Sequence, residues 1–374
     1  MKQTENRLDI SIRKFTSDDH ARAKIIANRA FPTTQSRFVL PGKAGGMVAT
    51  INGEVAAMSL VRVFRLPFGG RVGMIAWLMT DPDFRGKGLA SRLVNASTDY
   101  LRNQGCSEVV TDIEGYNTSS ANVFHSAGYR RIGCWQQMQR WNPLDLIWLW
   151  IQTRLAVDPG YFLWADGVDS PRAGSWHGHL GAVLLNSFLA LLALSLGGGL
   201  FLAGNAGMPD ILQVLATLIG VTILLASREI TMRLTALINR QPLEFRAWEG
   251  GWGISLIIAL CFGRTMPLPG NLYPKGDGWR TRDYTKTLGQ AAVANALVLV
   301  CIVLGASLVR ERMTGEFLEQ AMLILIFVGK PLLLFDTLVA IAPFEGFNAR
   351  HLRDYSRPAW LALAALAVVV FVWG

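Results

Sequence analysis

The chain has 374 residues, of which 51% are hydrophobic and 17% charged, and 12 are tryptophans. This balance is too apolar for one ordinary soluble domain, so we expect a membrane part. The formal net charge of +9 does not indicate a nucleic-acid partner, because basic residues of membrane proteins gather in cytoplasmic loops. The N-terminus lacks the apolar stretch of a cleaved secretory signal. The 4 cysteines show no ligand spacing, which indicates a reducing compartment and no metal site.

Residues 1–141 alternate between short strand and helix patterns, which predicts an α/β domain around one mixed sheet. The pair Asn52 and Gly53 predicts the turn of a β-hairpin. The expected order is strand 8–15, helix 16–31, hairpin 46–64, strand 71–81, helix 86–105, strand 107–114, helix 117–128 and one or two closing strands within 129–141.

Residues 142–179 are rich in tryptophan and are expected to form an interfacial linker. Within them, residues 144–155 read LDLIWLWIQTRL, a helix pattern for which two interpretations stand. In the first, the helix lies at the lipid headgroups, where indole rings are favoured. In the second, it packs on the α/β domain.

Residues 180–374 are expected to form a multi-pass transmembrane domain, because they contain several long uncharged apolar stretches. Residues 250–263 are too short to cross and are expected to be re-entrant or interfacial. Lys330 and Asp336 lie inside one expected span, where ionisable side chains pair with another span or face a polar cavity. Basic residues gather in the loops that place the N-terminal domain in the cytoplasm. The five expected spans are 180–204, 209–227, 288–309, 318–343 and 358–373.

The segment TDPDFRGKGLASRL, residues 80–93, joins an apolar strand pattern to an amphipathic helix pattern. It is not a Walker A loop, because Lys87 is followed by glycine, and not a GxGxxG turn, because Ser91 replaces the third glycine. Amides at a helix start, with the helix dipole and flanking cations, suit a pyrophosphate. The turn also carries Arg85, Gly86 and Gly88.

This segment resembles the acetyl-CoA-binding motif of the GNAT acetyltransferase superfamily, Arg/Gln-x-x-Gly-x-Gly/Ala after a strand. The matching residues are Arg85, Gly88 and Ala90. NTSSANVFHSAGY is similar to the second motif of that family. Its matching residues are Asn117, Ser120, Gly128 and Tyr129. The resemblance covers about residues 7–141 and implies a GNAT fold, a mixed and splayed β-sheet flanked by helices.

The resemblance also implies how acetyl-CoA is held. The amides from Arg85 to Ala90 would cradle the pyrophosphate. The strand before the turn would bind the pantetheine and stabilise the tetrahedral intermediate, as an oxyanion hole does. An acceptor amine would then attack directly, so that a base must take its proton. The residues assigned to acetyl-CoA are Leu78, Met79, Thr80, Arg85, Gly86, Lys87, Gly88, Leu89, Ala90 and Asn117.

Phe124 departs from the family pattern, which often has a tyrosine there as the acid for the departing CoA thiolate. Phenylalanine cannot donate a proton. His125 or Tyr116 would then serve as the acid, or the thiolate leaves without one. Asp112 and Glu114 on the preceding strand are the candidates for the base.

Residues 208–374 resemble site-2-type intramembrane proteases, through FGRTMPLPGNLYPKGD, LGQAAVANALVLV and TLVAIAPFEGFNARHL. In an HExxH helix, two histidines bind zinc and the glutamate is the base. With Glu229 aligned to that glutamate, Arg228 and Met232 stand at the histidine positions and cannot replace imidazole. The resemblance therefore implies a protease scaffold without its metal, which would not be a zinc protease.

Together these patterns predict an N-acetyltransferase of the GNAT type, anchored in the cell membrane, with acetyl-CoA and an unidentified amine acceptor as substrates. The alternative is a catalytically weak acetyl-CoA-binding sensor or regulator, coupled to a pseudoprotease-like membrane domain.

Overall fold

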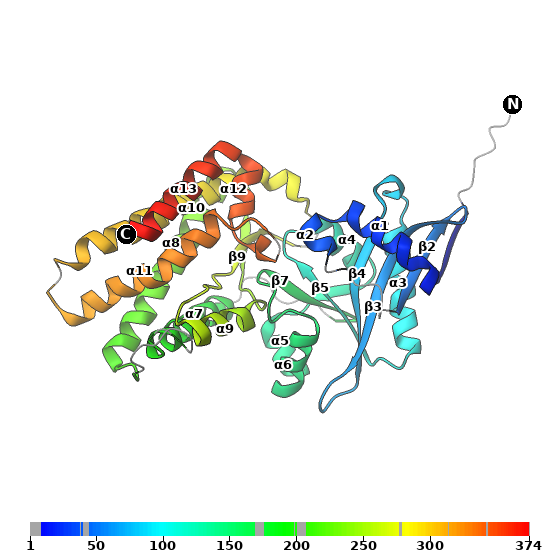
Figure 1. Ribbon diagram of the computed structural model, residues 1–374, viewed down its shortest axis with the longest axis horizontal. Helices are drawn as coiled ribbons and strands as arrows, with labels where there is room; N and C mark the ends of the chain where they lie inside the picture. The colour runs from blue at the N-terminus through cyan, green and yellow to red at the C-terminus, as the bar shows by residue number, and fades with distance from the viewer. Residues whose placement is uncertain are drawn as a thin grey trace. The chain divides into compact units, whose positions relative to one another are not determined.

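A computed structural model describes residues 9–37, 39, 45–168, 176–197, 199, 207–276, 279–312, 314–341 and 343–373. The chain divides into two compact units (Figure 1). The first unit comprises Met1–Ile113, Ser119–Thr153 and Leu163–Pro171. The second comprises Glu114–Thr118, Arg154–Phe162 and Arg172–Gly374. Each unit is therefore assembled from segments that are separated in the sequence.

The first unit is built on a seven-stranded sheet of order β1-β2-β3-β4-β5-β7-β6. The first four strands are antiparallel neighbours, β4 and β5 are parallel, and β6 and β7 are antiparallel. This is the mixed sheet expected of a GNAT fold. The strands are β1 (Ile10–Lys14), β2 (Gly45–Ile51), β3 (Glu54–Arg65), β4 (Arg71–Thr80), β5 (Glu108–Glu114), β6 (Tyr129–Arg131) and β7 (Tyr161–Asp166).

Helices cover both faces of this sheet. Because side chains alternate along a strand, the neighbours Val48 and Ala49 on β2 face opposite cores. The first core joins Val48, Met58, Leu60 and Met79 to Ala23, Ile26 and Ala27 of α1 (His20–Ala30). The second joins Ala49, Ile51, Ala56 and Ala57 to Leu89 and Leu93 of α3 (Leu89–Asn103). The shorter helices here are η1 (Ser17–Asp19), α2 (Thr33–Ser36), η3 (Pro82–Phe84) and α4 (Thr118–Ser126).

Of the one or two closing strands expected within 129–141, the structure has one, β6. After β6, residues Cys134–Arg140 form a helix, α5. Polar side chains start this helix, because the Gly133 amide donates to Oε1 of Gln136 at 3.0 Å and Gln137 Nε2 donates to the Ile132 carbonyl at 2.9 Å. The strand that pairs with β6 is β7, which comes from the segment 142–179 expected to be a linker.

The helix expected within 144–155 is confirmed as α6 (Pro143–Gln152). Asn142 caps it, because its Oδ1 accepts the Asp145 amide at 3.0 Å. Asp145 Oδ1 also accepts the Phe68 amide at 2.8 Å, which fastens α6 to the β3–β4 hairpin. The outer face is apolar, with 40–58% of each side chain exposed in Leu144, Ile147, Trp148 and Ile151. One face of α6 thus packs on the first unit, and the other remains open.

In the second unit, four of the described helices are long and apolar enough to cross a membrane. They are α7 (Trp176–Ser195), α8 (Ile211–Ile238), α10 (Thr281–Arg310) and α11 (Glu316–Thr337). The fifth expected span, 358–373, corresponds to α13 (Arg357–Trp373), a shorter apolar helix. Residues 198 and 200–204 of the first expected span lie outside the described residues. The remaining elements are the ribbon β8 (Leu243–Arg246) and β9 (Asn271–Pro274), the short apolar helix α9 (Trp252–Phe262), η4 (Phe344–Gly346) and α12 (Ala349–Tyr355).

The helices α8, α10 and α11 pack around a common apolar core (Figure 1). A Cβ on Gly220 of α8 would stand only 2.7 Å from Cγ2 of Ile324 on α11, so glycine permits this close approach. The opposite face of α8 is exposed and apolar at Ile211, Leu215, Ile219, Ile223, Ile230 and Leu234. An apolar stripe of this length is costly in water and favourable in lipid.

Candidate functional site

The strands β4 and β5 pair over only part of their length. Their parallel pairing ends at Met74 and Val110. β4 continues to Thr80 and β5 to Glu114, with no further register pair among the described residues of these strands. A bulge at Ala76, where the register with β3 shifts, bends β4 in the same stretch. The end of β4 therefore has an edge without a strand partner, as expected of a splayed sheet.

The glycine turn leads from η3 into α3. Gly86 has φ 78° and Gly88 has φ 72°, the left-handed region that side chains disfavour. A Cβ built on either glycine would meet no atom within 4 Å, so the space beside the turn is open. The first amides of α3 have no partner within the helix. With exposed Arg85 and half-buried Lys87 beside them, these residues fit a pyrophosphate.

A buried carboxylate, Asp81, fixes the start of this turn. It is fully buried and accepts hydrogen bonds from Arg22 at 3.1 Å and Arg29 at 2.9 Å. Its Oδ1 accepts the Asp83 amide at 3.2 Å, and its own amide donates to the Ala56 carbonyl at 2.9 Å. Because Asp81 lies between β4 and η3, the network determines where the strand passes into the glycine turn.

This network was not predicted from the sequence. Asp81 directly before Pro82 is a sequence signal for a helix N-cap, and Asp81 does cap η3. No local signal connects Asp81 to the arginines of α1, because the contacts depend on how α1 packs across the sheet.

The other residues assigned to acetyl-CoA in the first unit differ in burial. Met79 and Leu89 are buried in the two core clusters on opposite faces of the sheet, so their side chains are unavailable to a ligand. Leu78, Thr80 and Ala90 are half-buried. Met79 and Leu89 can therefore bind a ligand only through their backbone groups.

The candidate acid and base residues of the first unit are placed differently. Asp112 on β5 and His125 on α4 are both half-buried. Phe124 is 2% exposed, and its ring lies edge-on to Tyr129 with 5.1 Å between ring centroids. Phe124 therefore belongs to the core, and a hydroxyl at this position would be buried.

Glu114, the second candidate base, ends β5 and packs within the second unit. It is 4% exposed, its Oε1 accepts the Tyr116 amide at 3.0 Å, and Arg350 Nη1 lies 3.4 Å from its Oε2. Burial raises the pKa of Glu114 to about 7, although Arg350 opposes the rise. Asn117, assigned to acetyl-CoA, is exposed in the same segment.

Tyr116 is not placed to act as the acid for a thiolate. Its side chain is 1% exposed, and its hydroxyl donates to the Leu272 carbonyl at 2.9 Å. Burial raises the pKa of this phenol well above its usual value. A hydroxyl so engaged is held by the fold of the second unit.

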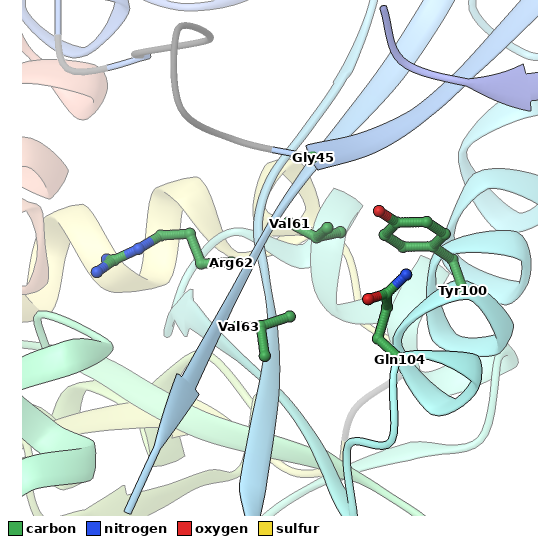
Figure 2. A pocket seen from close by; sticks show the side chains of 6 residues that line it. All are labelled: Gly45, Val61, Arg62, Val63, Tyr100 and Gln104. Carbon is green, nitrogen blue, oxygen red and sulfur yellow. The ribbon is translucent and has the colours of Figure 1, made fainter.

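The first unit also has an open hollow of about 300 Å³ beside α3 (Figure 2). Figure 2 shows Tyr100 and Gln104 on the same side of β3 as Val61 and Val63, whereas Arg62 points away. This arrangement follows from the alternation of side chains along β3. The lining residues are Gly45, Val61, Arg62, Val63, Tyr100 and Gln104, so this hollow is separate from the glycine turn.

The second unit buries an ion pair between its helices. Arg228 Nε of α8 lies 2.8 Å from Asp336 Oδ2 of α11, so Asp336 pairs with another apolar helix. Asn295 of α10 donates to the same oxygen at 2.9 Å, and the Asn348 amide donates to Asp336 Oδ1 at 3.2 Å. Met232, one turn beyond Arg228, is also buried. The Arg228 guanidinium thus satisfies Asp336 and repels any metal cation.

Within the described residues, no group of three or more His, Cys, Asp or Glu side chains is arranged to hold a metal.

Comparison with known proteins places the first unit in a class. Residues 13–129 match the acetyltransferase (GNAT) family. N-alpha-acetyltransferase 30 of Schizosaccharomyces pombe is 34% identical over 59 residues, which are 16% of this chain and 39% of that protein. The chain thus spans well under two thirds of this curated relative.

Two solved structures are similar in fold. The ribosomal-protein-S18-alanine N-acetyltransferase of Escherichia coli aligns with TM-score 0.31 and 18% identity, over 42% of this chain and 93% of that one. Naa50 of Arabidopsis thaliana, in complex with the bisubstrate analogue CoA-Ac-MVNAL, aligns with TM-score 0.32 and 16% identity, over 42% of this chain and 99% of that one. By the family match and the sequence relative, the N-terminal part of the chain is an α/β domain of the acyltransferase class, and it is a GNAT acetyltransferase domain. GNAT relatives bind acetyl-CoA or CoA as co-substrate.

Proposed function

We propose that this protein is a membrane-anchored N-acetyltransferase that transfers the acetyl group of acetyl-CoA to an amine. The observation that carries the proposal is the glycine turn beside the open edge of β4. Gly86 and Gly88 leave the space beside the turn free, and the turn lies within residues 13–129, which match the GNAT family.

In this proposal the amides from Arg85 to Ala90 bind the pyrophosphate, assisted by the charges of Arg85 and Lys87. The backbone of Leu78, Met79 and Thr80 binds the pantetheine and the thioester carbonyl. Asn117 contributes a further polar contact, as the second family motif implies. Amide donors at the carbonyl stabilise the oxyanion that forms when the amine attacks.

The amine nitrogen forms a bond to the thioester carbonyl carbon, the carbon–sulfur bond breaks, and CoA leaves as a thiolate. We assign the proton acceptor to Glu114, because a carboxylate with a pKa of about 7 is matched to proton transfer at neutral pH. Asp112 and His125 are the remaining candidates for proton transfer. Phe124 and Tyr116 supply no acid, so the thiolate leaves unprotonated or takes a proton from His125.

Anchoring in a membrane is supported by the four long apolar helices and by the exposed apolar stripe of α8. The apolar face of α6 suits the headgroup region, where its Trp148 indole is favoured. The basic loops favour a cytoplasmic N-terminal domain. An amine acceptor that is itself in or near the membrane fits this arrangement.

For the C-terminal part we propose a site-2-protease-like scaffold without its zinc site. The buried contacts of Arg228 with Asp336 support this, because a guanidinium stands where the protease motif has a zinc-binding histidine. Such a scaffold presents a substrate or a ligand to the acetyltransferase and does not hydrolyse peptides.

The second candidate function is an acetyl-CoA sensor with weak turnover. It is favoured by the burial of Glu114 behind Arg350 and by the absence of a hydroxyl at Phe124. In a sensor the domain binds acetyl-CoA, and the membrane part responds to occupancy.

The proposal is tested on the full chain in lipid nanodiscs, by acetyl-CoA binding and by release of CoA thiol with a panel of amines, lysine peptides and aminolipids. Gly88→Glu places a side chain and a negative charge in the pyrophosphate space, so we expect acetyl-CoA affinity to fall about 100-fold, the loss of about two charge-assisted hydrogen bonds. Gly53→Glu is the matched control, because Gly53 has φ 83° and open space at the hairpin turn.

Unchanged affinity in Gly88→Glu contradicts the acetyl-CoA site. Binding of acetyl-CoA without acyl transfer to any amine contradicts the enzyme and supports the sensor.

A further inference from the structure

The segment Glu114–Thr118 belongs to the acetyltransferase domain by sequence and to the second compact unit by packing. It lies within residues 13–129, which match the acetyltransferase family, yet it packs in the second unit. It contains one candidate base and one candidate acetyl-CoA residue. The second unit therefore holds part of the acetyltransferase sequence in place.

Aromatic packing fixes this segment. The ring of Tyr116 stacks on Tyr273 of β9 with 4.4 Å between centroids, and the ring of His351 of α12 meets its face at 4.3 Å. The Tyr116 hydroxyl donates to the Leu272 carbonyl. All of these side chains are at least 96% buried. The position of Glu114 is thus set by β9 and α12.

Arg350 is the only cation whose ion pair with Glu114 is seen among the described residues. Its Nη1 lies 3.4 Å from Oε2 of Glu114 and 3.6 Å from Oε2 of Glu345. Its Nε lies 3.8 Å from Asp354 on the next turn of α12. One guanidinium is therefore shared among three carboxylates, and none of its contacts with them is short.

The charge of Glu114 depends on this sharing. Burial raises the pKa of Glu114, and the negative charge of Glu345 raises it further, while Arg350 and the Tyr116 amide lower it. The titratable and charged groups that face Glu114 are Arg350 of α12, Glu345 of η4, Tyr273 of β9 and Tyr116. His351 of α12 lies edge-on to the Tyr116 ring. Burial holds the pKa of His351 at about 3, so its ring is neutral and adds no charge.

We infer that Arg350 is a positioning residue for acetyl transfer, through which α12 sets the ionisation of the base Glu114 and hence the rate. The inference rests on the proposed function, in which Glu114 accepts the proton of the amine. When Arg350 faces Glu114, the carboxylate is ionised and ready to accept a proton. When Arg350 turns toward Glu345 or Asp354, Glu114 takes up a proton and the amine cannot be deprotonated by it. The part of the chain that carries the apolar helices thereby controls an acetyltransferase that would otherwise be independent of it.

The experiment measures the pH profile of kcat and of KM for acetyl-CoA, with the full chain in nanodiscs. In Arg350→Met the cation is lost, so the pKa of Glu114 rises and the rise of kcat with pH moves by about 1 unit or more to higher pH. We expect kcat at pH 7 to fall about tenfold and to recover at higher pH, while KM for acetyl-CoA stays the same. Arg350→Lys restores part of the shift.

Arg357→Met is the control variant, because Arg357 is exposed and lies at the start of α13. It should leave the pH profile unchanged. A loss of kcat in Arg350→Met that is equal at every pH indicates structural damage and overturns the inference.

A second measurement does not depend on turnover. The infrared band of a protonated carboxylic acid that is lost in Glu114→Gln belongs to Glu114, and its titration should move to higher pH in Arg350→Met. An unshifted band overturns the inference even if the enzyme is active. If the native chain acetylates no amine, the proposed function is wrong and so is the inference. If the enzyme is active but the pH profile of kcat does not shift in Arg350→Met, the inference alone is wrong.

Discussion

Asp81 of the first unit and Glu114 of the second are both buried carboxylates, and their surroundings differ. Asp81 receives two guanidinium groups at 2.9 and 3.1 Å and a backbone amide at 3.2 Å. Glu114 receives one backbone amide at 3.0 Å and one shared guanidinium at 3.4 Å. A carboxylate with many short, charge-assisted hydrogen bonds holds structure. A carboxylate with few and distant partners has a raised pKa, which suits a group that must gain and lose a proton.

The largest effect on kcat is expected from replacing Glu114, the carboxylate with few partners. Glu114→Gln keeps the shape of the side chain but cannot accept a proton, so kcat should fall by about 10²- to 10⁴-fold. The folded pKa of about 7 means that the native rate rises as pH increases through 7, because the base must be ionised. This rise should be absent in the variant. Steady-state rates across pH 5.5–9 (about 1.5 to 2 units on either side of the pKa) check both points.

Acetyl-CoA affinity is the control for Glu114→Gln and should not change. A loss of kcat below about threefold would transfer the role of base to Asp112.

A smaller effect is expected at Asp81. Asp81→Ala removes the cap of η3 and the buried carboxylate that two guanidinium groups share, which should destabilise the turn by about 1 to 3 kcal/mol. Acetyl-CoA affinity should fall about tenfold, and kcat at saturating acetyl-CoA should change little. Calorimetric titration and saturation kinetics separate the two quantities.

Asp83→Ala is the milder companion, because the Asp83 side chain is exposed and its ion pair among the described residues is with Arg29. Equal losses in the two variants would contradict the role given to Asp81.

The smallest effect is expected at Phe124, where the family often has a tyrosine. Because Phe124 is buried against Tyr129, the hydroxyl of Phe124→Tyr would be buried without a partner, at a cost of about 1 to 3 kcal/mol. We expect a lower apparent melting temperature and no gain in kcat. A gain of tenfold or more would show that the hydroxyl reaches the thiolate.

Much of the first unit was predictable because its signals are local. The Asn52-Gly53 turn, the alternation along β2 and β3, and the glycines before α3 each act over a few residues. The helix α5 was missed because a short polar segment such as 134–140 has no clear period, and its start depends on the side chains of Gln136 and Gln137. The strand β7 was missed because its partner β6 lies far away in the sequence.

Of the candidate site, only the glycine turn, which acts through its backbone, could be predicted from the sequence. The glycine turn is recognised from its residues, whereas the role of Asp81 depends on arginines of α1. Glu114 was named as a candidate, but no pattern near it points to Arg350, 236 residues later. Contacts between distant segments follow from packing, which a single sequence does not encode locally.

The pairing of β6 with β7 also has a consequence for folding. Tyr129 of β6 pairs with Asp166 of β7, so the sheet cannot be completed until α5 and α6 have been synthesised. Contacts this far apart in sequence form slowly, because the intervening loop must close first. Only residues 167–175 separate β7 from α7. The last strand of the acetyltransferase sheet therefore leaves the ribosome just ahead of the first long apolar helix, and the two must fold in close succession.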